Sequence, residues 1–507
     1  MSAREGSLRR PVPSTGRIIA SVIPVGPDKP GRLPASAATL RLRRLPDRVA
    51  QARPIDVAEA FRDLPGLALL ESARPGRNAR WTYLTADPVA VLEGPAAGPD
   101  PFAVMRRLLA RLDPTPVIPA DAPRFLGGLV GFLGYEVGLA LERLPTIAPD
   151  DQGLPPLRLG LHDWAVAWDR RTGHAWLAGR ALDGDARRLA RRLDDVHARL
   201  IGEAPVATGP APGSDTMADS GRLRFRSSLS RAAYRAGVQA VRAHIARGDI
   251  YQANLTRRLE TDFDGDPWDG YRRLRTGDPS LFSAYLDLGP SPETGRPRAL
   301  LSASPEPFLS VDQAGVVASD PIKGTRPRGR DRAEDRALAR ELLASAKDRA
   351  ENVMIVDVLR NDLGRVCVPG TVRVPRLCRL ERTAAVQHLV STVTGRLLPG
   401  RDAFHLLVAA FPGGSITGAP KIRAMEILEG LEPVRRGPYT GALGWVGPDG
   451  AMQTSILIRT FVADGRRLSL HVGGGITWRS DPDREWDETV AKASGPLGAI
   501  GGDESPS

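Results

Sequence analysis

Pro321–Gly329 read PIKGTRPRG and contain a lysine, Lys323, in a chain that almost never uses lysine. Only five lysines stand among the 70 lysine and arginine residues of the 507-residue sequence. A solvated surface charge can be either residue, but an amine nucleophile cannot be arginine, whose guanidinium stays protonated in proteins. The scarcity of lysine therefore favours a chemical role for Lys323 over the ordinary alternative of a surface ion pair.

The composition restricts the class of protein. The length and the 42% hydrophobic content predict a globular protein with a large core. No apolar run approaches the roughly 18 residues that cross a bilayer, and the N-terminus lacks a signal-peptide pattern, so we expect no membrane association. The net charge of +11 is scattered without a basic stripe, which argues against nucleic-acid binding. Two cysteines, Cys367 and Cys378, are too few for a disulfide framework, which fits a cytoplasmic location.

Composition also divides the chain. Residues 1–40 are rich in Pro, Gly, Ser and Arg and predict a disordered extension, to which we assign no function. A second Pro- and Gly-rich stretch, residues 204–221, predicts a linker between two large regions, 41–203 and 222–500, with residues 501–507 as a tail.

Hydrophobic periodicity predicts strands at Val89–Leu92 and Trp164–Trp168. Helical patterns cover Arg187–Leu200 and Arg231–Arg247, and one long helical pattern runs over Asp331–Leu359. Because helices and strands intermix without a repeat or βαβ alternation, the fold class is predicted to be α+β.

Two pairs of carboxylates have helical spacing. Asp348 and Glu351 lie three residues apart, and so do Glu485 and Glu488, in a helix that Asp481 is suited to cap. The ordinary alternative is surface charge, including an i, i+4 pair between Glu488 and Lys492.

Two glycine-rich segments accompany these pairs. Backbone N–H groups of Gly473–Gly475 are free to approach an anion closely, although such a trio also suits a turn. Phe411–Lys421, FPGGSITGAPK, lacks the spacing of a nucleotide-binding P-loop, so we reject a nucleotide site and expect a ligand-facing turn.

Several motifs in order resemble the chorismate-utilising enzymes, and within them the component I chains of aminodeoxychorismate synthases. The similarity is strong over residues 222–497. The motifs are IYQANL (250–255), PIKGTRPRG (321–329), AENVMIVDVLRNDLGRV (350–366), FPGGSITGAPKIRAM (411–425), RGPYTGALGW (436–445) and the stretch 473–492.

The first region resembles the N-terminal half of the same family through Leu69–Ser72 (LLES) and Gly127–Tyr135 (GGLVGFLGY). The resemblance implies a chorismate-binding, anthranilate synthase component I-like fold, a large mixed β-sandwich with helices packed outside. Residues 41–203 would form its N-terminal region and 222–500 its catalytic region. In tryptophan-making relatives the LLES segment helps to bind tryptophan, so the resemblance also allows a bound tryptophan here.

Two positions separate the activities of the family. Anthranilate synthases carry alanine where this chain has Lys323, whereas aminodeoxychorismate synthases carry lysine. Isochorismate and salicylate synthases place a water-activating lysine where this chain has Gln252, which cannot act as that base. The resemblance therefore implies an aminodeoxychorismate synthase, with anthranilate synthase component I as the alternative. A protein that kept the fold without catalysis would require lost site residues, and the principal ones are present.

The resemblance also implies a set of ligands. Mg²⁺ would bridge a chorismate carboxylate to Glu351 and Glu488, with Glu485 and Asp348 as further or water-linked partners, and oxygen ligands suit this cation. His388 fits a buried core histidine equally well. The residues implied to contact substrate are Arg459, Tyr439, Gly474, Gly475, Arg365, Ser415, Asn254 and His388.

In the implied reaction Lys323 attacks the ring while Glu306, as general acid, protonates the departing C4 hydroxyl. Ammonia then adds at C4 and displaces the lysine, which gives 4-amino-4-deoxychorismate for p-aminobenzoate and folate synthesis. Such a general acid needs a raised pKa. The chain contains no glutamine-hydrolysing domain, so a separate glutamine amidotransferase subunit is the expected source of ammonia.

Overall fold

The structure is a computed structural model of the 507-residue chain. It describes residues 18–19, 39–74, 76, 79–94, 100–113, 121–144, 146–202, 222–383 and 386–506. The predicted linker 204–221 and nearly all of the predicted extension 1–40 lie outside the described residues.

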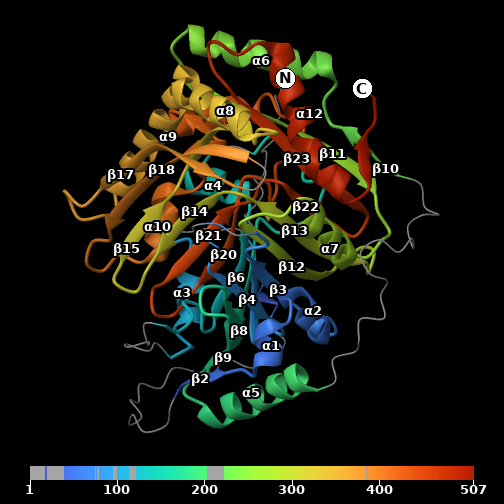
Figure 1. The fold of residues 1–507 in the computed structure, drawn as a ribbon, viewed down its shortest axis with the longest axis vertical. Helices are drawn as coiled ribbons and strands as arrows, with labels where there is room; N and C mark the ends of the chain where they lie inside the picture. Colours follow the sequence, from blue (N-terminus) through green and yellow to red (C-terminus); the bar gives the residue numbers. More distant parts are fainter. Residues whose placement is uncertain are drawn as a thin grey trace, which may run out of the picture.

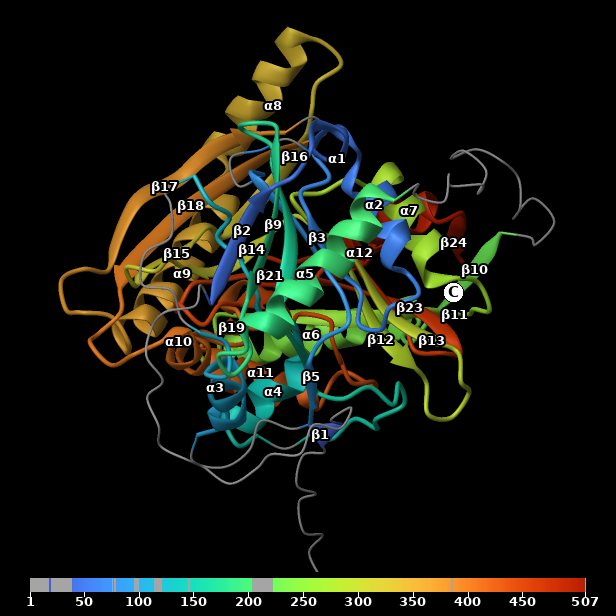
Figure 2. The ribbon, with the colours of Figure 1, turned by 90° about the horizontal axis from the view of Figure 1, so that it is seen from below.

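Two large β-sheets form the centre of the molecule (Figures 1 and 2). Within the described residues the first sheet has 11 strands and the second has 13. All pairs are antiparallel except the parallel pair of β10 with β24. The order in the first sheet is β1 (Ile18–Ile19), β5 (Ala90–Glu93), β7 (Leu157–His162), β6 (Gly128–Leu133), β20 (Ala442–Val446), β21 (Met452–Ile456), β14 (Pro307–Val311), β15 (Val316–Ser319), β18 (Val386–Arg396) and β16 (Ile322–Pro327), with β17 (Arg373–Arg382) paired to β18.

The second sheet carries the remaining strands. Its order is β2 (Leu40–Arg44), β9 (His174–Arg180), β8 (Trp164–Asp169), β4 (Trp81–Thr85), β3 (Ala68–Glu71), β12 (Phe282–Pro290), β13 (Pro297–Ser304), β22 (Thr460–Ala463), β23 (Arg467–Ile476), β11 (Gln252–Asp262), β10 (Leu223–Ser227) and β24 (Gly502–Glu504), with β19 (Gly418–Ala419) paired to β11.

Helices cover the outer faces of the two sheets (Figure 1). α9 packs on β16 and β18 of the first sheet, whereas α12 packs on β23 of the second. The helices are α1 (Asp47–Gln51), α2 (Pro54–Ala58), α3 (Ala103–Leu109), α4 (Tyr135–Leu141), α5 (Ala186–Ile201), α6 (Arg231–Ala246), α7 (Pro267–Gly277), α8 (Arg332–Ala344), α9 (Ala346–Gly364), α10 (Ala403–Ala410), α11 (Lys421–Glu429) and α12 (Pro482–Ala499), with 3₁₀ turns η1 (Glu59–Phe61) and η2 (Gly414–Ile416).

The core is layered in the same way. One buried cluster, which includes Tyr83, Phe132, Leu286 and Trp445, joins the inner faces of the two sheets. Two larger clusters join each sheet to its own helices. The α+β sandwich with helices packed outside, implied by the family resemblance, is confirmed.

Strands from both halves of the sequence share each sheet. β6 pairs with β20 in the first sheet, and β3 pairs with β12 in the second. Residues 41–203 and 222–500 therefore build one architecture together. The residues predicted as a tail contribute β24, whose Glu504 pairs with the buried Arg257.

The helical predictions hold at 187–200 and 231–247, and β5 and β8 cover the predicted strands. The single long helix over 331–359 was wrong. The helix is interrupted at Ser345, which has an extended backbone (φ −64°, ψ 105°). The Ser345 side chain caps α9 by accepting a hydrogen bond from the Asp348 N–H. Leu343 and Val353 of the expected apolar face are 39% and 38% exposed.

Candidate active site

Lys323 lies on β16 at the end of the first sheet's path. Its Nζ donates a hydrogen bond to the Ser415 carbonyl in η2 at 3.1 Å. The β16–β18 register is irregular between Ile322 and Thr325, and such irregularities re-aim side chains. Gly324 adopts a φ of +82°, and a Cβ there would lie 2.8 Å from the Asp348 Cβ. The glycine thus allows Lys323 to lie close beside α9.

Glu306 lies just before β14 in the same region and is 6% exposed. Its Oε1 is buried without a hydrogen-bond partner. Burial raises the pKa of Glu306, while the charge of Lys323 and hydrogen bonds from Ser415 and the Ile322 backbone act in the opposite direction. The net direction is the one that a general acid requires.

Glutamates from two helices meet beside this pair. Lys347 Nζ lies 3.9 Å from Oε1 of Glu351 on α9 and 3.9 Å from Oε1 of Glu485 on α12. Glu488, one turn further along α12, forms an ion pair with Lys492 at 2.8 Å. The two carboxylate pairs seen in the sequence are therefore neighbours in space, and Glu488, which is 47% exposed, also forms the expected i, i+4 pair with Lys492.

Burial raises the pKa values of Glu351 and Glu485, and Lys323 and Lys347 oppose this rise at Glu351. Burial also pushes the pKa of Glu488 upward, but Lys492 outweighs it and the net pKa is lowered. Glu351 and Glu485 are thus deprived of water and only partly compensated by lysines, whereas Glu488 is 47% exposed.

The glycines of β23 make room for these groups. A Cβ at Gly474 would lie 3.0 Å from Glu485 Oε2. A Cβ at Gly475 would lie 2.5 Å from Gln252 Nε2 and 3.8 Å from Lys323 Nζ. Gln252 is fully buried, and both polar atoms of its amide lack a hydrogen-bond partner. The space next to Gly475 is therefore bordered by unpaired polar groups.

Tyr439 and Asn254 adjoin the same strands. Asn254 lies opposite Gly475 in the β11–β23 ladder and hydrogen-bonds Tyr439 through its side chain. Tyr439 is 5% exposed and stacks on His471 with ring centroids 5.0 Å apart. Burial raises the pKa of Tyr439, so it stays a neutral hydrogen-bonding group.

His388 lies opposite Thr325 on β16, and Arg459 lies near His388. His388 Nδ1 is 2.9 Å from Thr325 Oγ1 on β16, and burial, reinforced by Arg74 and Arg459, lowers the pKa of His388 to about 4. Arg459 adopts a φ of 49°, uncommon for a residue with a side chain, and its Nη1 lies 3.5 Å from Asp278 Oδ1. Two guanidinium groups thus face a neutral imidazole and one carboxylate.

Sequence reasoning missed Arg74. Its Nε is buried without a hydrogen-bond partner, and the nearby charge of Arg459, after burial, helps to lower the pKa of Arg74. The signal available in the sequence was its position two residues after the LLES segment.

The structure does not bring Arg365 to this cluster. Arg365 follows α9 by one residue, 14 positions after Glu351, which corresponds to about 21 Å along a helix axis. It is half-exposed and bonds Asp362 and the Ala409 carbonyl. The RNDLGR segment places it at the end of α9 away from Lys323.

The fit of Mg²⁺ depends on these carboxylates. The described residues contain no group of three or more His, Cys, Asp or Glu arranged to hold a metal ion. Glu351 Oε1 is nevertheless buried without a hydrogen-bond partner, and Glu351 and Glu485 share one cation, Lys347. Because Mg²⁺ commonly takes one or two carboxylates and completes its octahedron with water and substrate, the residues present fit this ion.

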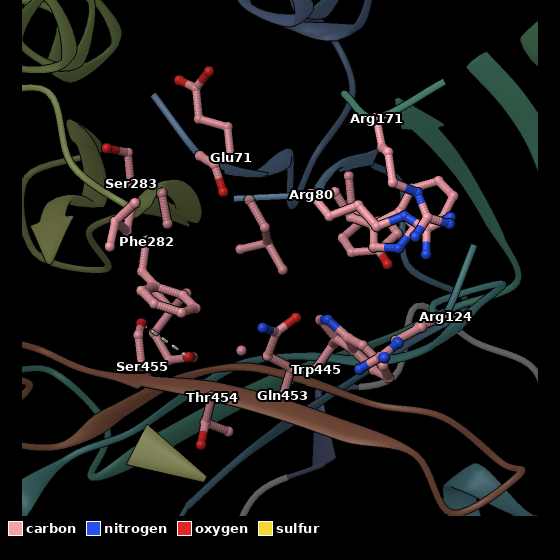
Figure 3. Close-up of a pocket in the computed structure, with 18 residues that line it drawn as sticks. Glu71, Arg80, Arg124, Arg171, Phe282, Ser283, Trp445, Gln453, Thr454 and Ser455 are labelled. Atoms are coloured by element: carbon pink, nitrogen blue, oxygen red, sulfur yellow. Dashed lines mark hydrogen bonds between the residues drawn. The ribbon is translucent and has the colours of Figure 1, made fainter. Parts of the chain in front are cut away.

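A separate cavity of about 320 Å³ lies between strands of the two sheets (Figure 3), and Lys323 is not among the residues that line it. Leu70, Glu71 and Ser72 of the LLES segment border it. Figure 3 shows Arg80, Arg124 and Arg171 grouped on one side and Glu71, Phe282 and Ser283 on the other. The remaining lining residues are Trp81, Tyr83, Leu281, Ala284, Leu443, Gly444, Trp445, Gln453, Thr454 and Ser455.

The fold and the Lys323 cluster together bring an amine, a buried carboxyl and several glutamates to one place. The family of chorismate binding enzymes matches residues 70–498, and the chain belongs to this family. It is 42% identical over 443 residues to anthranilate synthase component 1 of Streptomyces coelicolor, covering 85% of this chain and 83% of that protein.

Relatives with another activity are about as similar. Aminodeoxychorismate synthase component 1 of Salmonella typhimurium is 40% identical over 428 residues, covering 82% of this chain and 88% of that protein. The crystal structure of anthranilate synthase component I from Streptococcus pneumoniae superposes with a TM-score of 0.68 at 27% identity, over 93% of this chain and 95% of that one. The chain is therefore a chorismate-utilising enzyme of the aminodeoxychorismate or anthranilate synthase type.

Within the described part of the chain, no helix combines the length and hydropathy needed to cross a bilayer. Cys367 and Cys378 are both free and buried.

Proposed function

We propose that the chain converts chorismate and ammonia to 4-amino-4-deoxychorismate through a covalent adduct on Lys323. The observation that carries this proposal is the place of Lys323, an amine within 3.8 Å of the Cβ position at Gly475 and beside the buried carboxyl of Glu306. Anthranilate synthases of the family carry alanine at this position. An amine here adds a nucleophile that those enzymes lack.

The chemistry divides between the two residues. Lys323 forms a C–N bond to the ring while the C4 hydroxyl leaves as water, with its proton supplied by Glu306. Ammonia then forms a bond at C4 and releases the lysine amine, and a proton returns to Glu306. Splitting one substitution into two steps is the usual benefit of covalent catalysis.

The other residues would hold the substrate. In this proposal Arg459 and Tyr439 would offer a cation and a neutral donor for a carboxylate, and Ser415, Asn254 and His388 would border the ring. Glycines 474 and 475 let the substrate approach the β23 backbone.

Glu351, Glu485 and Glu488 would hold Mg²⁺ in this proposal. When bound, the ion would neutralise a chorismate carboxylate and help to orient the ring.

The expected partner is a glutamine amidotransferase subunit that supplies ammonia. Support comes from the "component 1" names of the relatives, which imply a second component. The two free cysteines suit a reducing cytoplasm. The cavity beside Leu70–Ser72 suits a bound tryptophan, because its aromatic rings match an indole and its arginines match a carboxylate.

Anthranilate synthase component I is the second candidate, favoured by the 42% identity to a relative of that name. It would release pyruvate and an aromatic product and would not need Lys323.

Product identification separates the two. The purified chain is incubated with chorismate, Mg²⁺ and ammonium at mildly alkaline pH, beside a Lys323→Ala variant, and products are identified by mass spectrometry. Aminodeoxychorismate from the wild type and its loss in the variant would support the proposal. Anthranilate from the wild type would overturn it.

A further inference from the structure

The lysines of this chain gather at one place. Of the described lysines, Lys323, Lys347 and Lys492 all border the Lys323 cluster, while Lys421 is buried in an ion pair with Asp362. Arginine serves nearly every other cationic position. The choice of lysine at positions 347 and 492 therefore calls for a property that arginine lacks.

Lys347 stands where a cation is intrinsically unfavourable. It lies in the first turn of α9, directly after Ala346, and the positive end of the helix dipole destabilises cations there. Its side chain is 47% exposed, whereas the Glu351 and Glu485 side chains are 15% and 5% exposed. The ammonium thus extends from solvent towards two carboxylates that have lost most of their water.

The contacts of Lys347 are symmetrical and loose. Both N–O separations are 3.9 Å, beyond hydrogen-bond distance, so the ammonium compensates charge without being fixed by a directional bond. An arginine would form a planar, bidentate and less easily displaced pair with a carboxylate.

From this geometry we propose that Lys347 is a displaceable counter-ion of the Glu351–Glu485 pair. Its ammonium compensates the charge of the two carboxylates when no divalent cation is bound. When a divalent cation enters between the carboxylates, the Lys347 side chain rotates away into solvent. The inference rests on the proposed metal role of these glutamates and adds a residue that competes with the metal. Lys347 is a positioning residue, since it contacts neither substrate nor reacting atoms.

The test measures metal binding directly, with Mn²⁺ as the probe and no chorismate present, by titration calorimetry on the full chain. Lys347→Met should bind Mn²⁺ roughly fivefold more tightly than the wild type, because a competing charge has been removed. Lys347→Arg should bind it about fivefold more weakly, because the guanidinium is harder to displace.

Arg349→Met is the matched control. Arg349 lies two residues further along the same helix, is exposed, and forms no ion pair with a described residue. The Arg349→Met substitution removes one positive charge from the same turn without changing a contact of the carboxylates. The Mn²⁺ affinity of this variant should therefore stay within about twofold of the wild type.

Thermal unfolding in EDTA gives a second readout. Lys347→Met should unfold about 1–2 °C below the wild type, because Glu351 and Glu485 lose their counter-ion, and saturating Mn²⁺ should close this gap.

Equal Mn²⁺ affinity in Lys347→Met and Arg349→Met would overturn the counter-ion role and leave the metal site standing. Absence of Mn²⁺ binding in every form would overturn the metal assignment and this inference together. Aminodeoxychorismate formation with ammonium, measured separately on the wild type, distinguishes either failure from failure of the proposed reaction.

Discussion

Two regions of the molecule differ in the side chains that line them. The cavity beside Trp445 has a volume of about 320 Å³ and is lined by aromatic rings, by Glu71 and by three arginines. Around Lys323, charged side chains from β16, α9 and α12 reach towards one another and pair across the space. The first region is therefore a cavity between strands of the two sheets, whereas the charged groups of the second region pair with one another.

The strongest test of this contrast is Lys323→Ala. We expect a loss of aminodeoxychorismate formation of about 1000-fold or more, because the nucleophile is gone, with little change in stability. Mass spectrometry of the product and a thermal melt measure the two effects. Turnover within tenfold of the wild type would move the chemistry away from this region.

Glu306→Gln should lower turnover by about 100-fold, since the amide cannot donate a proton to the leaving hydroxyl. Its stability should change in the opposite direction. Because the folded pKa of Glu306 is raised, the native state binds the extra proton, and the wild type loses stability as pH rises from the unfolded value through the folded value.

Above that window the glutamine variant avoids the cost of a buried charge, so we expect a melting temperature about 1–3 °C higher than the wild type at pH 8. Below pH 4 the two proteins should melt alike. A variant that is less stable at pH 8 would contradict the raised pKa.

A substitution in the cavity should lower stability and leave turnover nearly unchanged, the reverse of Lys323→Ala. Trp445 is 3% exposed and packs on Tyr83 and Phe125, so Trp445→Leu should lower the free energy of unfolding by about 2 kcal/mol. Turnover should stay within about threefold of the wild type. Urea unfolding provides the stability, and Trp478→Leu, at a 57% exposed position, is the control that should change it by less than about 0.5 kcal/mol.

Tryptophan provides the smallest and most specific effect. At ten times its dissociation constant it should stabilise the wild type by about 1.4 kcal/mol, seen as a rise in melting temperature. Ser283→Leu, which places a larger side chain in the cavity, should lose this rise and keep its turnover. Equal stabilisation of both proteins would place tryptophan elsewhere.

Much of this arrangement could be predicted from the sequence, because the motifs that carry the family resemblance contain the glycines and carboxylates of the site. Gly474, Gly475 and the carboxylates of two distant helices were expected together and lie together. Asp481 caps α12 as its spacing predicted. The Asp481 cap is local and spacing along the chain specifies it, whereas the meeting of the two helices was expected from the family resemblance.

What could not be predicted depends on tertiary packing. Ser345 divides the expected long helix because its hydroxyl caps α9. The spacing of apolar residues continues through this cap and does not reveal it. Arg365 shares a motif with Glu351 but lies at the other end of a 19-residue helix. Arg74 and Lys347 could not be singled out because their neighbours are far away in sequence. Arg74 lies near Arg459, and Lys347 lies near Glu485.

The strand order has a consequence for synthesis on the ribosome. β20 and β21 fill the gap between β6 and β14, and β22 lies between β13 and β23, so late residues complete the middle of both sheets. About 300 residues separate β6 from its partner β20, a delay of roughly 15–60 s at bacterial elongation rates. Throughout that interval the nascent chain carries strands without their neighbours, and unpaired strand edges are sites of aggregation. Holdase chaperones that bind such edges should therefore raise the yield of this protein more than that of one whose sheets close in sequence order.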